Sequence, residues 1–305
     1  MSLLTAAAHV LGLSPNTFVV TVGMAAVGMA AGVVGCFSVL RRRALVGDAA
    51  AHATLPGVAI AFAITGSRGL PVLLLGAALS AVASLGVLVL LRRFTRTRED
   101  AATAIVIGVS FGVGVALISG LVARGVPGSG GLERFLLGST ASLSTADATM
   151  LVVVSLVAMA LVAAFTKEAT LVSFDPGFAA AAGWPVWWID FALVALTAVM
   201  VVVGLPAAGA VLVTALVVIP PVAARQWTDR VGVMLVLAGL FGLAASLLGV
   251  ALSATIPGLA TGPMVVLAAS AIFTVSLLLA PKRGLLAIAM RARQPLSLPL
   301  ERAQP

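Results

Sequence analysis

The sequence predicts an all-α membrane protein, a polytopic bundle of about eight or nine transmembrane helices. Hydrophobic residues make up 61% of its 305 residues and charged residues only 9%, with a mean hydropathy of +1.21. Soluble globular domains carry about 25% charged residues. The apolar stretches are continuous runs of Ala, Val, Leu and Gly, and runs of about 20 such residues are long enough for helices to cross a bilayer. Barrel strands would instead show short segments of alternating hydrophobicity.

Nine apolar runs, separated by charges and turn residues, are the expected spans. The fifth run is too long for one simple crossing, and its Ser- and Thr-rich start at 138–145 favours a short helix or re-entrant piece before the span. Residues 1–284 are expected to form one transmembrane domain with a cytoplasmic loop at 166–185, followed by a flexible cytoplasmic tail at 285–305. The runs cover residues 17–40, 46–66, 70–91, 101–122, 135–165, 186–203, 207–224, 231–252 and 260–280.

Lysine and arginine set the expected orientation. Of the 18 basic residues, only Arg68, Arg124 and Arg134 fall in loops on one side of the predicted bundle. Cytoplasmic loops carry the excess of Lys and Arg. We therefore expect a multi-pass protein of the cell (inner) membrane, with its N-terminus outside and its C-terminus in the cytoplasm. The net charge of +8 reports this topology and does not indicate nucleic-acid binding.

Small residues spaced four apart predict close contacts between helices. Gly28 with Gly32 and Gly108 with Gly112 follow this pattern. In lipid, such residues let two helix backbones approach closely. We interpret these glycines as packing residues, not as a phosphate-binding loop.

Asp48 and His52 are the strongest functional signal in the sequence. An ionisable side chain at membrane depth costs about 2.5 to 3.5 kcal/mol on insertion scales, so water, a partner group or an ion must compensate it. In a helix the two side chains would lie about 6 Å apart on one face. A carboxylate oxygen with an imidazole nitrogen suits zinc, manganese or ferrous iron. Cys36 is the single cysteine, so no thiolate cluster can hold a metal and no intrachain disulfide can form.

Neighbouring residues bear on this candidate site. Asp48 follows Gly47 and is also typical of a helix N-cap, a structural alternative that leaves His52 unexplained. Pro56 and Gly57 are expected to break the helix beside the pair and to free backbone carbonyls.

Two further aspartates are candidates for the metal path. Asp147 lies in the long fifth run and ranks ahead of Asp190, which follows a tryptophan cluster. Water at a membrane interface could satisfy either carboxylate instead.

The chain has no ATP-binding loop. Its two lysines, Lys167 and Lys282, do not follow a glycine as the Gly-x-x-x-x-Gly-Lys-Ser/Thr loop requires. We therefore expect a transporter subunit that is not itself an enzyme. ATP-driven transport would need separate ATPase subunits that dock on a cytoplasmic element.

The loop at 167–185 is the candidate dock. Asp175 and Pro176 can start a short helix, the alanines after Phe178 favour its continuation, and Gly183 can cap it. The alternative is an interfacial helix without a partner.

These residues resemble the membrane permease subunit of the zinc, manganese and iron class of ATP-binding-cassette importers. The resemblance is carried by residues 40–58, by Phe174-Asp175 with Ala179 and Gly183, and by residues 209–220 and 261–263. Family members often have serine at the position of Ala51 and an acidic residue at that of Gly177, so this chain lacks one hydroxyl near the site and one acidic group in the docking loop.

The resemblance implies a set of partners and roles. Asp48 and His52 would form the transit site, with the divalent metal ion (zinc, manganese or iron) as transported substrate and no permanently bound cofactor. The permease would pair with a second copy or a related chain, and an extracytoplasmic metal-binding protein would deliver the ion. Two cytoplasmic ATPase subunits would engage the coupling residues Phe174, Asp175, Pro176, Ala179 and Gly183.

Two other function classes fit part of the pattern. In a proton-coupled secondary transporter, Asp48 and His52 would relay protons and no ATPase would be involved. An intramembrane hydrolytic enzyme is a weaker fit, because the pair has no clear nucleophile beside it.

Overall fold

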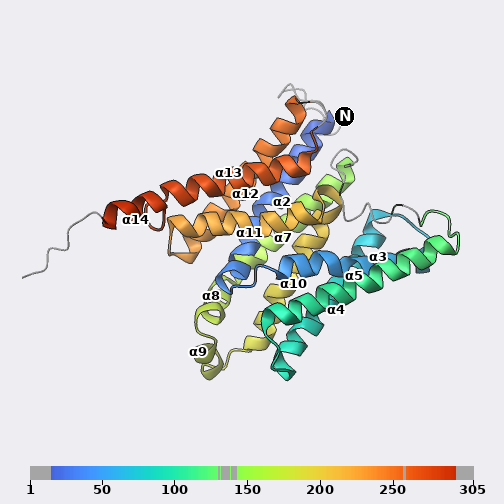
Figure 1. Ribbon diagram of the computed structural model, residues 1–305, viewed down its shortest axis with the longest axis horizontal. Helices are drawn as coiled ribbons and strands as arrows, with labels where there is room; N and C mark the ends of the chain where they lie inside the picture. Colours follow the sequence, from blue (N-terminus) through green and yellow to red (C-terminus); the bar gives the residue numbers. More distant parts are fainter. Residues whose placement is uncertain (1–14, 130, 132–137, 139–142, 257–258, 293–305) are drawn as a thin grey trace, which may run out of the picture.

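The computed structural model describes residues 15–292 apart from 130, 132–137, 139–142 and 257–258, and the described part consists of helices joined by short connections (Figure 1). Nine of the described helices are long and apolar enough to span a membrane. Each lies close to a predicted run, so this is a multi-pass helical protein. The spans are α2 (Pro15–Leu40), α3 (Val46–Thr65), α4 (Leu70–Phe94), α5 (Glu99–Ala123), α7 (Thr145–Ala164), α10 (Val186–Ala208), α11 (Ala210–Trp227), α12 (Val231–Thr255) and α13 (Thr261–Leu279).

Three shorter helices lie outside the spans. The helices α8 (Thr166–Phe174) and α9 (Pro176–Ala181) occupy the predicted cytoplasmic loop, and α14 (Leu285–Ala292) follows α13. The predicted tail was expected to be flexible from residue 285, yet it begins with this helix, because Leu285, Leu286, Ile288 and Met290 give helix-forming side chains to its first turns. Residues 293–305 lie outside the described residues, as does most of the segment in which a re-entrant piece was predicted.

The bundle has two helix groups, joined by α10 and by a contact between α3 and α11. The helices α3, α4 and α5 pack together on one side, and α11, α12 and α13 on the other (Figure 1). Both α2 and α10 contact members of the second group, and α10 also contacts α3 and α4. The largest described core cluster runs through α2, α3, α4, α10 and α11, so the candidate metal helix α3 is anchored on several sides.

Glycines permit the closest of these helix contacts. A Cβ at Gly28 would lie 2.0 Å from the Ser246 Oγ, and one at Gly32 would lie 2.4 Å from the Ala238 carbonyl oxygen, both on α12. This confirms the predicted packing role of Gly28 and Gly32. Around Gly108 and Gly112 on α5, by contrast, nothing lies within 4 Å of an added Cβ, so this second predicted pair packs against no described residue of the chain.

Two proline positions correct the predicted breaks. Pro56 was expected to interrupt the helix, but α3 continues through it to Thr65. A proline removes one backbone hydrogen bond, here the one to the carbonyl of His52, and packing against α4 and α5 holds the remaining turns in place. Gly57 serves that packing, because an added Cβ would lie 2.0 Å from the Gly76 carbonyl oxygen on α4. The helix α10 likewise continues through Pro206 to Ala208, and its C-cap Gly209 has a φ of 82°, which favours glycine.

Candidate functional site

Asp48 and His52 lie on one face of α3, as the sequence predicted. The Asp48 Oδ1 and the His52 Nε2 are 3.5 Å apart. The helix begins at Val46, its N-cap is Leu45, and the Asp48 side chain makes no capping hydrogen bond. The alternative that Asp48 serves as the N-cap is therefore wrong, and its carboxylate is available to a ligand. Its place in the first turn also favours the negative charge through the helix dipole.

The pair forms the polar, open side of the first turns of α3, whose other residues are buried. The Asp48 and His52 side chains are 46% and 30% exposed. Their neighbours Ala49, Ala50 and Ala51 are fully buried. The pair therefore faces away from the core of the chain, where an ion or a further chain can reach it.

Aromatic packing sets the orientation of His52. The Phe111 ring on α5 meets the imidazole edge to face, with 5.4 Å between ring centroids. The His52 Nδ1 is buried and has no hydrogen-bond partner in the described structure. Metal-ligating histidines commonly donate from their second nitrogen to an oxygen, which fixes the ring. Here the contact with Phe111 holds the ring instead.

The pair is an incomplete ligand shell. Among the described residues, no group of three or more His, Cys, Asp and Glu side chains could hold a metal ion. Cys36 is buried between α2 and α12, where its Sγ contacts the Gly32 and Met234 carbonyl oxygens. The carbonyl of His52 lacks its usual helical donor because residue 56 is proline, so it can serve as an additional oxygen ligand. Water, or a group from another chain, would have to supply the rest.

A large cavity elsewhere in the chain does not include the pair. Its volume is about 480 Å³, and it lies between the ends of α2, α10, α12 and α13. Asn16, Thr17, Ser253 and Thr261 supply polar groups to its wall. No carboxylate or imidazole is among its described lining residues, so it lacks the ligand chemistry of the Asp48 and His52 pair.

Asp147 is engaged in capping α7. Its carboxylate Oδ2 accepts from the Ser144 backbone N–H at 3.1 Å, while the Ser144 Oγ accepts from the Asp147 N–H at 3.2 Å. This reciprocal arrangement is a capping box. The described contacts do not bring Asp147 to Asp48 or His52, so its place on a metal path stays a prediction.

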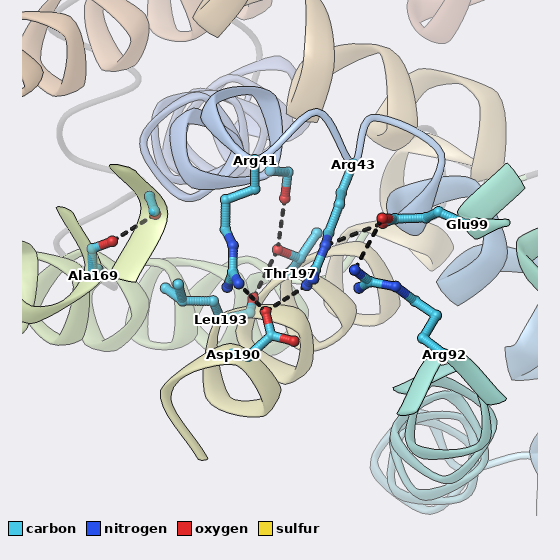
Figure 2. A network of polar contacts seen from close by, with 10 residues as sticks. Arg41, Arg43, Arg92, Glu99, Ala169, Asp190, Leu193 and Thr197 are labelled. Carbon is cyan, nitrogen blue, oxygen red and sulfur yellow. Dashed lines mark hydrogen bonds and ion pairs between the residues drawn. The ribbon is translucent and has the colours of Figure 1, made fainter. Parts of the chain in front are cut away.

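Asp190 lies among arginines. Its carboxylate Oδ1 accepts from the Arg43 Nη1 at 2.5 Å and also pairs with Arg41. Arg43 reaches on to Glu99, with 3.0 Å between its Nε and the Glu99 Oε1, and Arg92 contacts the other Glu99 oxygen at 3.1 Å (Figure 2). These five side chains, here called the ionic bracket, use the carboxylate of Asp190 for ion pairing, which corrects its candidacy as a metal ligand.

The ionic bracket was missed by sequence reasoning. The arginines had been interpreted as topology signals, and Glu99 had no assigned role. The available signal was the placement of the two acids near the starts of predicted spans, Glu99 just before the run at 101–122 and Asp190 just inside the run at 186–203. Which acid meets which arginine depends on the packing of α2, α4, α5 and α10, which a single sequence does not specify.

The predicted coupling loop folds as a helical elbow. Asp175 caps α9, because its Oδ1 accepts from the Phe178 N–H at 2.8 Å, and Pro176 occupies the first position. Gly183 ends the elbow with a φ of 84°. Ala179 is buried, whereas Phe174 and Phe178 are largely exposed. The elbow thus exposes the rings of Phe174 and Phe178 on its surface, while the buried Ala179 packs against the rest of the chain.

Fold and site define a polytopic helical membrane protein that carries a carboxylate and imidazole pair on a span. A family model described as "ABC 3 transport family" matches residues 14–280. The chain belongs to this family.

Named relatives and a solved structure agree with that assignment. The chain is 42% identical over 277 residues to the manganese transport system membrane protein MntC of Bacillus subtilis, a match that spans 91% of this chain and 64% of that protein's length. It is 41% identical over 275 residues to the zinc transport system membrane protein TroC of Treponema pallidum, covering 90% of this chain and 92% of that protein. The structure of PsaBC from Streptococcus pneumoniae in complex with Fab superposes with a TM-score of 0.75 at 29% identity, covering 88% of this chain and 94% of that one.

Proposed function

We propose that this chain is the membrane-spanning permease subunit of an ATP-driven importer of a divalent transition-metal ion. Manganese and zinc rank ahead of iron, because they are the metals in the names of the relatives. The observation that carries the proposal is the Asp48 and His52 pair, held 3.5 Å apart on the open side of α3.

The pair suits an ion in passage. One carboxylate and one imidazole match a borderline divalent ion and leave most of its shell to exchangeable ligands. A transport site must bind strongly enough to admit the ion and weakly enough to release it. The second half of the shell would come from water, the His52 carbonyl or the second permease chain.

Energy would come from separate ATPase subunits docked on α8 and α9. The exposed rings of Phe174 and Phe178 give this elbow an apolar contact surface on a segment between two spans. Asp175, Pro176, Ala179 and Gly183 shape the elbow and would make or support the contact. An extracytoplasmic binding protein would deliver the ion at the opposite side.

Replacing the pair tests this function. Asp48→Ala and His52→Ala should each reduce metal accumulation to the level of cells without the transporter, because either change removes half of the protein ligands. Element analysis of cells that produce the chain with its ATPase and binding protein measures this. The matched control is Asp229→Ala, which changes an exposed side chain in the loop between α11 and α12. This variant should retain uptake.

Two outcomes would contradict the proposal. Full metal accumulation in both site variants, with normal amounts of protein in the membrane, would remove the pair from the path. Uptake that depends on the proton gradient alone, by a chain that never co-purifies with an ATPase, would favour the proton-coupled secondary transporter.

A further inference from the structure

The ionic bracket contains residues that are close along the chain to the metal pair and to the coupling elbow. Arg41 and Arg43 belong to the connection between α2 and α3, and Asp190 belongs to the second turn of α10 (Figure 2). Arg43 and Asp190 are 8% and 12% exposed. Ion pairs of this kind are sensitive to the loss of either partner, since the remaining charge stays buried without compensation. The bracket therefore holds α3 and α10 in one register.

An unusual turn directs both arginines to the same carboxylate. Arg42, which lies between them, has a φ of 58°, the one positive value outside glycine in the described chain. The Arg42 N–H donates to the Val39 carbonyl and the Arg43 N–H to the Ser38 carbonyl, a Schellman motif that ends α2. Glycine usually occupies the left-handed position of this motif, so an arginine there is held by its surroundings.

The bracket connects directly to the metal pair. The Arg43 carbonyl accepts from the Val46 N–H at 3.2 Å, and Val46 is the first residue of α3. Asp48 lies in that same first turn, so a displacement of Arg43 moves the backbone that carries the carboxylate. A hydrogen bond of 3.1 Å between the Ser38 and Thr197 hydroxyls ties α2 to α10 beside the bracket (Figure 2).

The bracket connects just as directly to the elbow. The helix α9 ends in a second Schellman motif, in which the Gly183 N–H donates to Ala180 and the Trp184 N–H to Ala179. Pro185 follows and α10 begins at Val186, one turn before Asp190. Trp187 in that first turn also packs under the Arg93 guanidinium, 5.8 Å from the ring centroid, next to Arg92 of the bracket. A movement of α9 therefore reaches Asp190 through a short, tightly turned segment.

We propose that the ionic bracket transmits the movement of the α8 and α9 elbow to Asp48 and His52, so that Arg43 and Asp190 are positioning residues of the transport cycle. This inference rests on the proposed function. Neither residue touches the ion. Through the bracket, a movement of α10 displaces Asp48 and His52. Without the bracket, the ATPase subunits still hydrolyse ATP, but the metal pair does not move with α10.

The test uses the assembled transporter with its ATPase subunits in proteoliposomes, with manganese and zinc as probes. Asp190→Asn should reduce the maximal uptake rate by about tenfold or more, equivalent to about 1.4 kcal/mol in the barrier. The metal concentration at half-maximal uptake and the ATPase rate should change by less than about twofold, because binding and docking surfaces are intact. Asp190→Glu, which keeps the charge, should restore part of the uptake per ATP hydrolysed.

The matched control is Asp229→Asn. Asp229 also pairs with basic residues, Lys282 and Arg283, but at an exposed site in the loop between α11 and α12. This variant should keep a normal ratio of uptake to ATP hydrolysis. An equal loss of that ratio in both aspartate variants would overturn the proposal, as would an unchanged ratio in Asp190→Asn.

A second variant keeps the test decisive if Asp190→Asn does not fold. Arg43→Gln with Glu99→Gln removes one charge of each sign and leaves the pair of Arg41 and Asp190 in place. A reduced ratio of uptake to ATP hydrolysis supports the transmission role, and a normal ratio overturns it. Asp48→Ala in the same vesicles separates the two hypotheses. If Asp48→Ala still transports, the proposed function fails. If it does not transport while both bracket variants behave normally, only the transmission role fails.

Discussion

At the scale of single residues, glycine shows which helix faces are in contact within the chain. An added Cβ at Gly28 would lie 2.0 Å from the Ser246 Oγ and 2.5 Å from the Gly242 carbonyl oxygen. At Gly108 nothing lies within 4 Å. A side chain larger than glycine is therefore excluded at Gly28 and accommodated at Gly108, although the sequence alone presents the two glycines as equivalent.

We predict that Gly28→Ala lowers the stability of the protein and that Gly108→Ala does not. Overpacking between α2 and α12 should cost about 1 to 3 kcal/mol. Alanine at Gly108 should be neutral or add up to about 1 kcal/mol, since it improves helix propensity in open space. Thermal unfolding of both purified variants in detergent measures the difference. Equal melting temperatures would show that α2 and α12 do not approach as closely as the structure has them.

The candidate site was predictable to the extent that it is local. Asp48 and His52 share a face because they are four residues apart in one helix, and that spacing is visible in the sequence. The role of Asp190 was not visible, because its partners Arg41 and Arg43 are about 150 positions away and meet it through the packing of α2 on α10. The break predicted at Pro56 is absent, because helices in lipid tolerate proline where neighbouring helices support the backbone.

At the scale of helices, the short α9 depends on its first residue. Asp175 accepts a hydrogen bond from the Phe178 N–H, and a helix of this length has few bonds of its own. Asp175→Ala should cost about 0.5 to 2 kcal/mol of local stability. Hydrogen exchange at the Phe178 amide should then be about twofold to thirtyfold faster.

Asp175→Asn is the control for this prediction, because asparagine keeps a side-chain oxygen that can accept the same bond. Its exchange rate should stay close to that of the unaltered chain. If the alanine and asparagine variants exchange equally fast, the cap does not hold α9.

The spans were the most predictable elements. Within the described residues, each long apolar run contains one spanning helix, because a lone segment in lipid satisfies its backbone by forming a helix. Their ends were less predictable. The predicted end at 203 fell short of the real end of α10 at Ala208, because the helix continues through Pro206. Composition also gave no indication that α14 would follow the last span.

At the scale of the whole molecule, Asp229 links the loop between α11 and α12 to the end of α13. Its carboxylate lies 2.9 Å from the Lys282 Nζ and 2.8 Å from the Arg283 Nη2. The hydrogen bond from Lys282 lowers the pKa of Asp229. Desolvation opposes this effect, and the charges of Lys282, Arg283 and Arg225 lower the pKa further. The folded protein thus releases this proton more readily than the unfolded chain does.

The pH dependence of stability follows from the direction of that shift. The contribution of Asp229 is fully present above its unfolded pKa, about 4, and is lost as the pH falls through the lower folded value. Asp229→Asn should therefore lower the melting temperature slightly at pH 7, and this difference should shrink as the pH falls below about 4. Thermal unfolding of both proteins across this pH range measures the difference. A constant gap at every pH would assign the effect to something other than the carboxylate charge.

The single thiol of the chain has a practical consequence for watching the transporter work. Cys36 is fully buried, with its sulfur enclosed by two backbone oxygens. A maleimide or nitroxide reagent would find almost nothing to label in the native protein. Probes attached to two cysteines, introduced at exposed positions on α9 and near the start of α3, would then report only the distance between these two positions. This distance could be followed during turnover without signal from labelled native cysteine.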